Sequence, residues 1–317
     1  MRTVFNGLVA ASILAVASGN ALADESGVAF WMSGQYASLA AVPPSPGWSL
    51  VSTAYYYSGS ADKTTTFQHG NTLSTGIKSD SPLLLLELGY ATESKFLGGQ
   101  PYIGLAWGPG SNYTSVNASL SQPALSGSRS DTVFGGTDLY PIASLAWNNA
   151  NHNWMSYITG NIPVGTYDPN SLSNLGIGHA AIDAGGGYTY LNAKSGLEFS
   201  AVLGFTYNAE NSDTNYKNGI DSHLDWGVSQ FLSANWQVGL VGYVYYQLTN
   251  DSGSGDRVGA FKSQVAAIGP EIGYAFSFNK QAAYFNLRGY KEFNAQNRVE
   301  GYALYAQLSL PLGGPGK

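Results

Sequence analysis

Residues 197–208 read LEFSAVLGFTYN, and the alternation in this stretch decides the fold class. Successive side chains of a β-strand point to opposite faces of the sheet. One face of this strand is therefore apolar or aromatic, with Leu197, Phe199, Ala201, Leu203, Phe205 and Tyr207. The other face is small or polar, with Glu198, Ser200, Val202, Gly204, Thr206 and Asn208. A strand with one continuous apolar face and one polar face is typical of a transmembrane β-barrel, which has lipid outside and a polar lumen.

The same division recurs in two other stretches. Leu84, Leu86, Leu88 and Tyr90 share one face while Glu87 lies on the other, and Trp236, Val238, Leu240, Val244 and Tyr246 share a face opposite Gln237, Tyr243, Tyr245 and Gln247. A soluble barrel has the reverse arrangement, because it keeps its charged side chains on the outer surface and its apolar side chains inside. The pattern therefore favours a barrel whose outer solvent is lipid.

Composition supports this interpretation and excludes other classes. Only 11% of the residues are charged, against about 25% in soluble domains. The net charge of -6 and the lack of a Lys/Arg cluster argue against a nucleic-acid partner. The chain has no cysteine and its histidines lack metal-ligand spacing, so we expect no disulfide, no metal and no cofactor.

The N-terminus has the features of an export signal. A charged start, an apolar run over residues 8–17 and the small-residue motif Ala21-Leu22-Ala23 predict a cleaved signal peptide at residues 1–23. No later stretch reaches the roughly 18 consecutive apolar residues of a spanning helix. We therefore expect an exported protein of the bacterial outer membrane that crosses the membrane with strands.

The remaining chain predicts an all-β fold, an antiparallel up-and-down barrel of about twelve strands over residues 48–312, followed by a tail at residues 313–317. The predicted strands begin near Trp48, Pro82, Pro101, Thr132, Trp154, His179, Ser195, Ile220, Trp236, Lys262, Ala282 and Val299. Their connections alternate between short and long, except for the short connection at residues 294–298. Short periplasmic turns and long extracellular loops are typical of outer-membrane barrels. Trp48, Trp147, Trp154 and Trp236 lie beside predicted periplasmic turns, as an interfacial aromatic girdle requires.

Strand parity identifies the side chains that face the lumen. The candidates for the lumen and the solute path are Glu87, Asp183, Glu198, His223, Asp225, Tyr243, Tyr245, Glu271, Arg288 and Tyr290. A two-residue turn at Asn279-Lys280 would place Glu271 opposite Arg288. This pair either braces the barrel wall or selects solutes by charge, and the sequence leaves both roles open. A turn centred on Ala234 would likewise set Asp225 against Tyr243 and His223 against Tyr245.

The triplet Asp221-Ser222-His223 suggests a hydrolase, but parity opposes this reading. Ser222 would face lipid while Asp221 and His223 face the lumen, so the serine lacks a base. We therefore expect no catalytic residues and no enzyme activity.

Residues 24–47 precede the barrel and form a separate N-terminal segment. Residues 33–42 predict a short helix that ends at Pro43. Trp31, Tyr36 and Leu39 need burial, and a twelve-strand barrel leaves a lumen that a short segment can enter. We therefore expect this segment to act as a plug on the periplasmic side.

Several stretches resemble a known family, the outer-membrane proteins assigned to the meta-pathway of phenol degradation. They are GQYASLAAVP (34–43), PGW (46–48), YYYSGSA (55–61), YPIASLAWNN (140–149), NWMSYITGNIPVGTYDP (153–169), LGIGHAAIDAGGGYTYLN (175–192), NGIDSHLDWGVSQFLS (218–233) and NLRGYKEF (286–293). The resemblance implies a transporter for passive uptake of small hydrophobic or aromatic compounds. Its expected partners are outer-membrane lipid, these solutes and, during biogenesis, the barrel-assembly machinery. The chain continues past Leu310 where such barrels usually end at an aromatic residue, which puts the assembly signal in doubt rather than the barrel.

Two other functions stay open at this stage. The first is a structural or adhesive barrel that acts through its extracellular loops. The second is an outer-membrane lipid hydrolase, which predicts an activity that Ser222→Ala abolishes. The solute, the direction of transport and the oligomeric state do not follow from the sequence.

Overall fold

The computed structural model describes residues 29–66, 72–121, 124–255 and 262–313. The predicted signal peptide, residues 24–28 and most of the C-terminal tail lie outside these ranges. No helix in the described ranges is long and apolar enough to cross a membrane.

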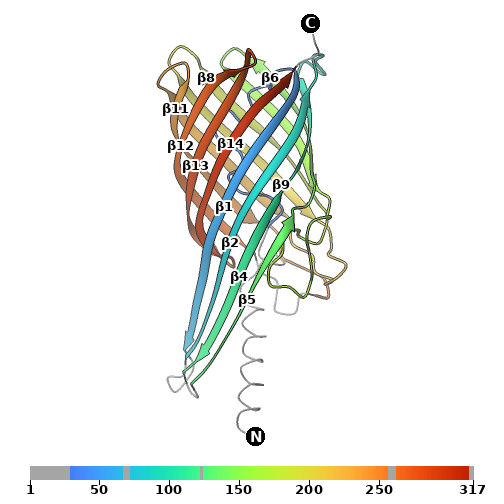
Figure 1. Cartoon of the computed structure of the whole chain (residues 1–317), viewed down its shortest axis with the longest axis vertical. Coiled ribbons are helices and arrows are strands. Elements are labelled where there is room, and N and C mark those ends of the chain that lie inside the picture. The colour runs from blue at the N-terminus through green and yellow to red at the C-terminus, as the bar shows by residue number, and fades with distance from the viewer. Residues whose placement is uncertain (1–28, 67–71, 122–123, 256–261, 314–317) are drawn as a thin grey trace.

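One antiparallel sheet of fourteen strands forms the molecule (Figure 1). The strands are β1 (Gly47–Thr66), β2 (Thr72–Ala91), β3 (Gln100–Trp107), β4 (Pro109–Leu120), β5 (Leu125–Gly136), β6 (Tyr140–Asn149), β7 (His152–Asn161), β8 (Ala181–Asn192), β9 (Leu197–Asn208), β10 (Asp221–Phe231), β11 (Trp236–Gln247), β12 (Gln264–Phe278), β13 (Gln281–Gln296) and β14 (Glu300–Gly313). Because β1 pairs with both β2 and β14, twelve of these strands close into a barrel, which confirms the predicted fold and strand number.

The strands β4 and β5 are additional to this closed barrel. Both β3 and β4 pair with β2, β3 along Leu86–Ala91 and β4 mainly along Leu73–Asp80. Between them, Gly108 approaches β2 so closely that a Cβ there would lie 1.7 Å from the Leu84 carbonyl oxygen. The barrel wall therefore divides at this glycine, and β4 with β5 runs beyond it as a separate hairpin.

Two of the long connections between the predicted strands were expected to be loops, at residues 59–81 before Pro82 and at residues 108–131 before Thr132. This expectation is wrong. Instead, β1 continues to Thr66, β2 begins at Thr72, and β4 pairs with β5 from end to end. Figure 1 shows these four strands extending past the rest of the barrel, at the end opposite the C-terminus. These stretches resemble loops because they are rich in Ser, Thr, Gly and Asn, and their few apolar residues form no continuous stripe. Backbone pairing holds them in strands, and the buried side chains of Ile77 and Val116 add apolar contacts on the inner face.

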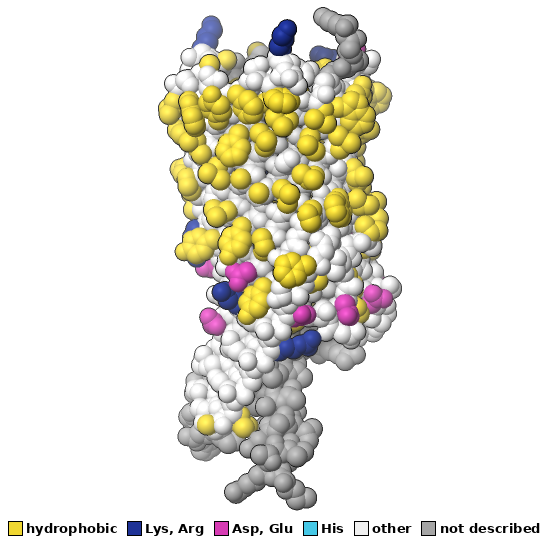
Figure 2. Space-filling view, viewed as in Figure 1, with side chains coloured by type: hydrophobic (Ala, Val, Ile, Leu, Met, Phe, Trp, Pro, Cys, Tyr) yellow, Lys and Arg dark blue, Asp and Glu magenta, His cyan; other side chains and the backbone are white. Residues whose placement is uncertain are grey.

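The outer surface has the predicted polarity. Along β9 and β11 exposed and buried residues alternate, and the exposed ones are those expected to face lipid. Figure 2 shows the hydrophobic side chains gathered in a band around the barrel, with charged side chains beyond both of its edges. Trp48, Trp154 and Trp236 are about half exposed, at 51%, 42% and 48%, near the end with the short turns. The fold is thus that of a barrel with a lipid-facing belt.

Residues 29–46 run inside the barrel and contain no regular secondary structure, so the predicted helix over residues 33–42 is wrong. Two residues of this stretch have positive φ, Gly34 at 82° and Leu39 at 67°, which a right-handed helix excludes. The N–H groups of Gly34, Leu39 and Ala41 bond to side chains of the wall instead of to carbonyl groups of the preceding turn. Tertiary contacts therefore override the local helix preference.

Candidate solute cavity

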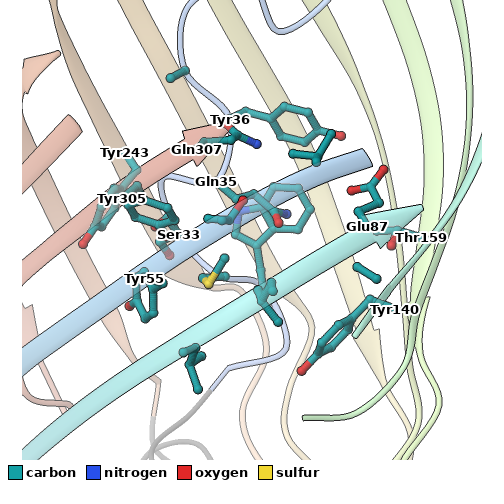
Figure 3. Close-up of a pocket in the computed structure, with 18 of the residues that line it drawn as sticks. Ser33, Gln35, Tyr36, Tyr55, Glu87, Tyr140, Thr159, Tyr243, Tyr305 and Gln307 are labelled. Carbon is teal, nitrogen blue, oxygen red and sulfur yellow. The ribbon is translucent and has the colours of Figure 1, made fainter. Parts of the chain in front are cut away.

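A cavity of about 540 Å³ lies between the N-terminal segment and one side of the barrel wall. Its other walls come mainly from β1, β2, β6 and β13, with further residues from β3, β4, β7, β11, β14 and the segment at residues 174–177. Figure 3 shows part of this space, with Tyr36 and Gln35 of the segment on one side and Tyr55, Glu87 and Tyr140 of the wall around them. The barrel is thus divided into a filled half and an open half.

Carboxylates of the wall hold the backbone of the N-terminal segment. Asp225 accepts the N–H groups of Gly34 at 3.0 Å and Tyr36 at 3.2 Å. Glu198 accepts the Leu39 N–H at 2.9 Å. Hydrogen bonds to ionised groups are stronger than neutral ones, and these acceptors are 0–1% exposed. The inward acids therefore bind the segment through its backbone N–H groups.

Donors of the wall bind the carbonyl groups of the same segment. Arg288 donates from Nε to the Gly34 carbonyl at 3.1 Å and from a terminal nitrogen to the Gln35 carbonyl at 2.8 Å. Tyr290 donates to the Gly34 carbonyl at 3.0 Å, and Tyr305 donates to the Ser33 carbonyl at 2.6 Å. The segment is therefore fixed through both its donors and its acceptors.

The predicted register of β12 and β13 is confirmed, but the expected ion pair is not formed. Glu271 lies directly opposite Arg288. Among the described residues, however, the salt bridges join Lys78 to Asp80, His223 to Asp183 and Arg298 to Glu292. The physical reason is competition from the N-terminal segment, because Ser38 donates to Glu271 while Arg288 turns to the carbonyl groups of Gly34 and Gln35.

Aromatic stacking fixes the start of the described segment. The Trp31 indole, 3% exposed, lies against the His223 ring with centroids 3.5 Å apart, and it also stacks on Tyr157. Behind it, Asp183 accepts hydrogen bonds from Tyr157 at 2.8 Å and Thr206 at 2.6 Å, and lies 3.0 Å from His223 Nε2. All three plug candidates line the cavity; Trp31 is buried, whereas Tyr36 and Leu39 are half-buried.

The wall opposite the segment carries an apolar patch, which parity reasoning missed. Residues 83–86 are four consecutive leucines, of which Leu84 and Leu86 face outward at 42% and 37% exposure. Leu83 and Leu85 therefore point inward, where they line the cavity. Further apolar or aromatic lining comes from Val51, Tyr55, Tyr140, Ile142 and Ala146. The signal was present as an apolar run without alternation, since a strand with lipid on one side and an apolar cavity on the other is apolar on both faces.

The candidate solute-path residues are divided between two environments. Glu87, Tyr243 and Arg288 line the cavity. The other candidates contact the segment or other inward side chains of the wall. For example, the hydroxyl of Tyr245 donates to Asp221 at 2.8 Å. The predicted cross-strand pairs of β10 and β11 have the expected register, with Asp225 opposite Tyr243 and His223 opposite Tyr245.

A second part of the cavity wall lies outside the barrel strands. Asp138, 1% exposed, accepts the N–H groups of Gly165 at 2.7 Å and Ile177 at 3.0 Å. These bonds hold the segment between β7 and β8 alongside β5, where Thr166 and Gly136 exchange hydrogen bonds. Leu175 and Ile177 of this segment line the cavity.

The triplet Asp221-Ser222-His223 has the geometry that parity predicts. Asp221 and His223 are buried inward, whereas the Ser222 hydroxyl donates to the Tyr246 carbonyl on the exposed side. No group of three or more potential metal ligands occurs within the described ranges. The triplet is therefore not arranged for nucleophilic catalysis.

Comparison with known proteins agrees with this architecture. A family model described as a putative MetA-pathway of phenol degradation matches residues 63–308. The chain belongs to this family.

A solved structure shares this fold. An outer membrane channel from Pseudomonas putida F1 aligns with a TM-score of 0.57 and 12% identity, over 88% of this chain and 98% of that chain. A Pseudomonas aeruginosa FadL homologue aligns with a TM-score of 0.46 and 10% identity, over 90% and 97% of the two chains. None of the curated proteins matches this chain.

Proposed function

We propose that this chain is a passive channel of the bacterial outer membrane for small hydrophobic or aromatic compounds. The single observation that carries the proposal is the inward face of β2, where Leu83 and Leu85 form part of an apolar patch on the cavity wall. A barrel for hydrophilic solutes has a polar, water-filled interior. Removing apolar surface from water is favourable by about 25 cal/mol per Å² of free energy, so contact of this wall with an apolar solute is more favourable than contact with water.

The dimensions of the cavity fit such a solute. Its volume of about 540 Å³ falls within the range of about 300–1,000 Å³ found for small-molecule sites. The link to phenol degradation in the family description points to the same solute class. The proposal includes export through the predicted signal peptide, contact with outer-membrane lipid and insertion by the barrel-assembly machinery.

In this proposal the N-terminal segment sets the width of the passage. Residues 29–46 fill the polar half of the lumen, so solutes pass along the apolar half. Deletion of residues 29–42 is expected to raise the single-channel conductance in planar bilayers. Unchanged conductance would show that the segment does not narrow the path.

Uptake by whole cells tests the proposed function. Cells that express the chain are expected to take up radiolabelled p-xylene or p-cresol faster than cells with an empty vector, at micromolar concentrations where the outer membrane limits the rate. A sugar of similar size serves as the control and is expected to show little difference. Equal uptake of the aromatic compounds with and without the chain would contradict the proposal.

A second candidate function rests on the four strands that extend past the barrel. The strands β1, β2, β4 and β5 form a polar protrusion of the kind that binds a partner outside the cell (Figures 1 and 2). This candidate predicts that replacing the β4–β5 hairpin with a short turn abolishes adhesion of expressing cells to a surface. The channel proposal predicts that the same variant retains uptake of aromatic compounds.

A further inference from the structure

The cavity contains one acidic group whose hydrogen-bonding capacity is only partly used by the protein. Four charged side chains line the cavity: Glu87, Arg288, Glu292 and Arg298. Glu292 accepts the hydroxyls of Tyr57 and Tyr243, both at 2.8 Å, and lies 3.5 Å from Arg298. Arg288 is bound to carbonyl groups of the N-terminal segment. These three charged groups thus have partners within the protein, Glu292 and Arg298 with each other and Arg288 with the N-terminal segment, although the buried Nε of Arg298 makes no hydrogen bond.

Glu87 differs from these three. Among the described residues its only hydrogen-bond donor is Tyr102, which bonds to Oε1. The second oxygen, Oε2, has no protein donor, and the side chain keeps an accessible surface that faces the cavity. The described part of the chain places no Lys or Arg in an ion pair with it. A carboxylate oxygen therefore points into the space that we assign to the solute.

The surroundings of this carboxylate are apolar. Val51 of β1 and Ala106 of β3 are its cross-strand neighbours, and Leu85 precedes it on the same inward face of β2. Figure 3 shows Glu87 in the same part of the cavity as Tyr36 of the N-terminal segment and Tyr140 of β6. An acceptor in an apolar setting forms stronger hydrogen bonds than one in water, and it is costly when a solute without a donor displaces its water.

We propose that Glu87 is a specificity-determining residue that selects apolar solutes carrying a hydrogen-bond donor, either a hydroxyl group or a protonated amine. The apolar body lies against Leu83 and Leu85, and the donor reaches Oε2 of Glu87. Solutes that carry a carboxylate are rejected because like charges repel. This inference rests on the proposed function and adds the chemical class of the solute.

Isothermal titration of the purified protein in lipid nanodiscs tests this inference, with empty nanodiscs as the reference for partitioning into lipid. The probes are p-cresol, its methyl ether 4-methylanisole, which lacks the donor, and benzylamine, which carries a cationic donor. We expect at least one of the two donors to bind roughly tenfold or more tightly than 4-methylanisole. A preference for p-cresol assigns the site to hydroxyl donors, and a preference for benzylamine assigns it to amines.

Two variants of Glu87 and one control complete the test. Glu87→Leu is expected to remove the preference, so that all three probes bind with similar affinity, and Glu87→Gln is expected to reduce it. Glu93→Gln is the matched control, because Glu93 is exposed in the turn after β2 and does not line the cavity. Heat-modifiable gel mobility verifies that each variant forms a barrel.

The outcomes separate this inference from the proposed function. If 4-methylanisole binds as tightly as both donors, or if Glu87→Leu keeps the wild-type preference, the role of Glu87 is wrong while the channel for apolar solutes stands. If none of the probes binds the wild-type protein, the proposed function and the role of Glu87 both fail.

Discussion

Glu271 and Arg288 lie directly opposite each other on β12 and β13, and the side-chain amide of Asn286 bridges them. The amide oxygen accepts from Arg288 at 2.8 Å, while the amide nitrogen donates to Glu271 at 3.1 Å. Glu271 also accepts from Ser38 of the N-terminal segment, and Arg288 donates to the Gly34 and Gln35 carbonyl groups of the segment and to Gln307 of β14. The two residues therefore act as a pair that binds the segment rather than as an ion pair that braces the wall.

This arrangement makes a prediction for the variants of the pair. Arg288→Ala should destabilise the barrel by several kcal/mol, because hydrogen bonds to charged groups contribute about 1.5–3 kcal/mol each. In the Arg288→Ala variant Glu271 keeps its donors Ser38 and Asn286, so it is not left as an unpaired charge. Adding Glu271→Gln to that variant should therefore not restore stability. The midpoint of the heat-induced gel shift measures both effects. Recovery of most of the lost stability in the double variant would instead show a direct ion pair.

Gly34 provides a test of how closely the segment packs on the wall. Its φ is +82°, and a Cβ at this position would lie 2.8–2.9 Å from ring atoms of Tyr290 and Tyr243. Gly34→Ala should therefore cost about 1–3 kcal/mol through overpacking and displace the segment. Protease cleavage within residues 29–46 of the purified barrel is expected to become faster.

Gly98→Ala is the control for Gly34→Ala. Gly98 has a similar φ of +78°, but a Cβ there meets nothing within 4 Å. This change adds backbone strain of about 1 kcal/mol without a collision. Equal cleavage rates in the two variants would mean that close packing of Gly34 does not hold the segment.

Asp138 is expected to control the segment between β7 and β8. Asp138→Ala removes the acceptor of the Gly165 and Ile177 N–H groups, and a buried donor left without a partner costs about 1–3 kcal/mol. Hydrogen exchange of these two amides should accelerate, while the amides of β9 should keep their protection. Unchanged exchange at Gly165 and Ile177 would show that other contacts hold this segment.

Sequence periodicity predicts the faces of β9 and β11 because lipid and the polar lumen impose opposite demands on neighbouring residues. It also predicts the register of β10 with β11 and of β12 with β13, since very short turns leave few alternatives. It fails for β4 and β5, whose Ser- and Gly-rich sequences contain too few apolar residues to show a stripe, although Val116 of β4 is buried.

The contacts of the candidate site are harder to predict from the sequence. Asp225 binds Gly34 across 191 positions of the chain, and no local pattern reports such a contact. The inward acids resemble a solute path in the sequence, but most of them bind the N-terminal segment in the structure. The apolar path was encoded in the four leucines at residues 83–86, where alternation breaks down because both faces of the strand are apolar.

The neighbouring leucines of β2 allow the most direct test of the proposed solute path. Leu85 lines the cavity, while Leu84 faces outward on the same strand at 42% exposure. Uptake of radiolabelled p-cresol by cells that express Leu85→Trp should fall well below the wild-type rate, because the larger indole occupies part of the cavity. Cells that express Leu84→Trp should keep the wild-type rate. Wild-type uptake by a correctly folded Leu85→Trp barrel would contradict the claim that solutes pass through this cavity.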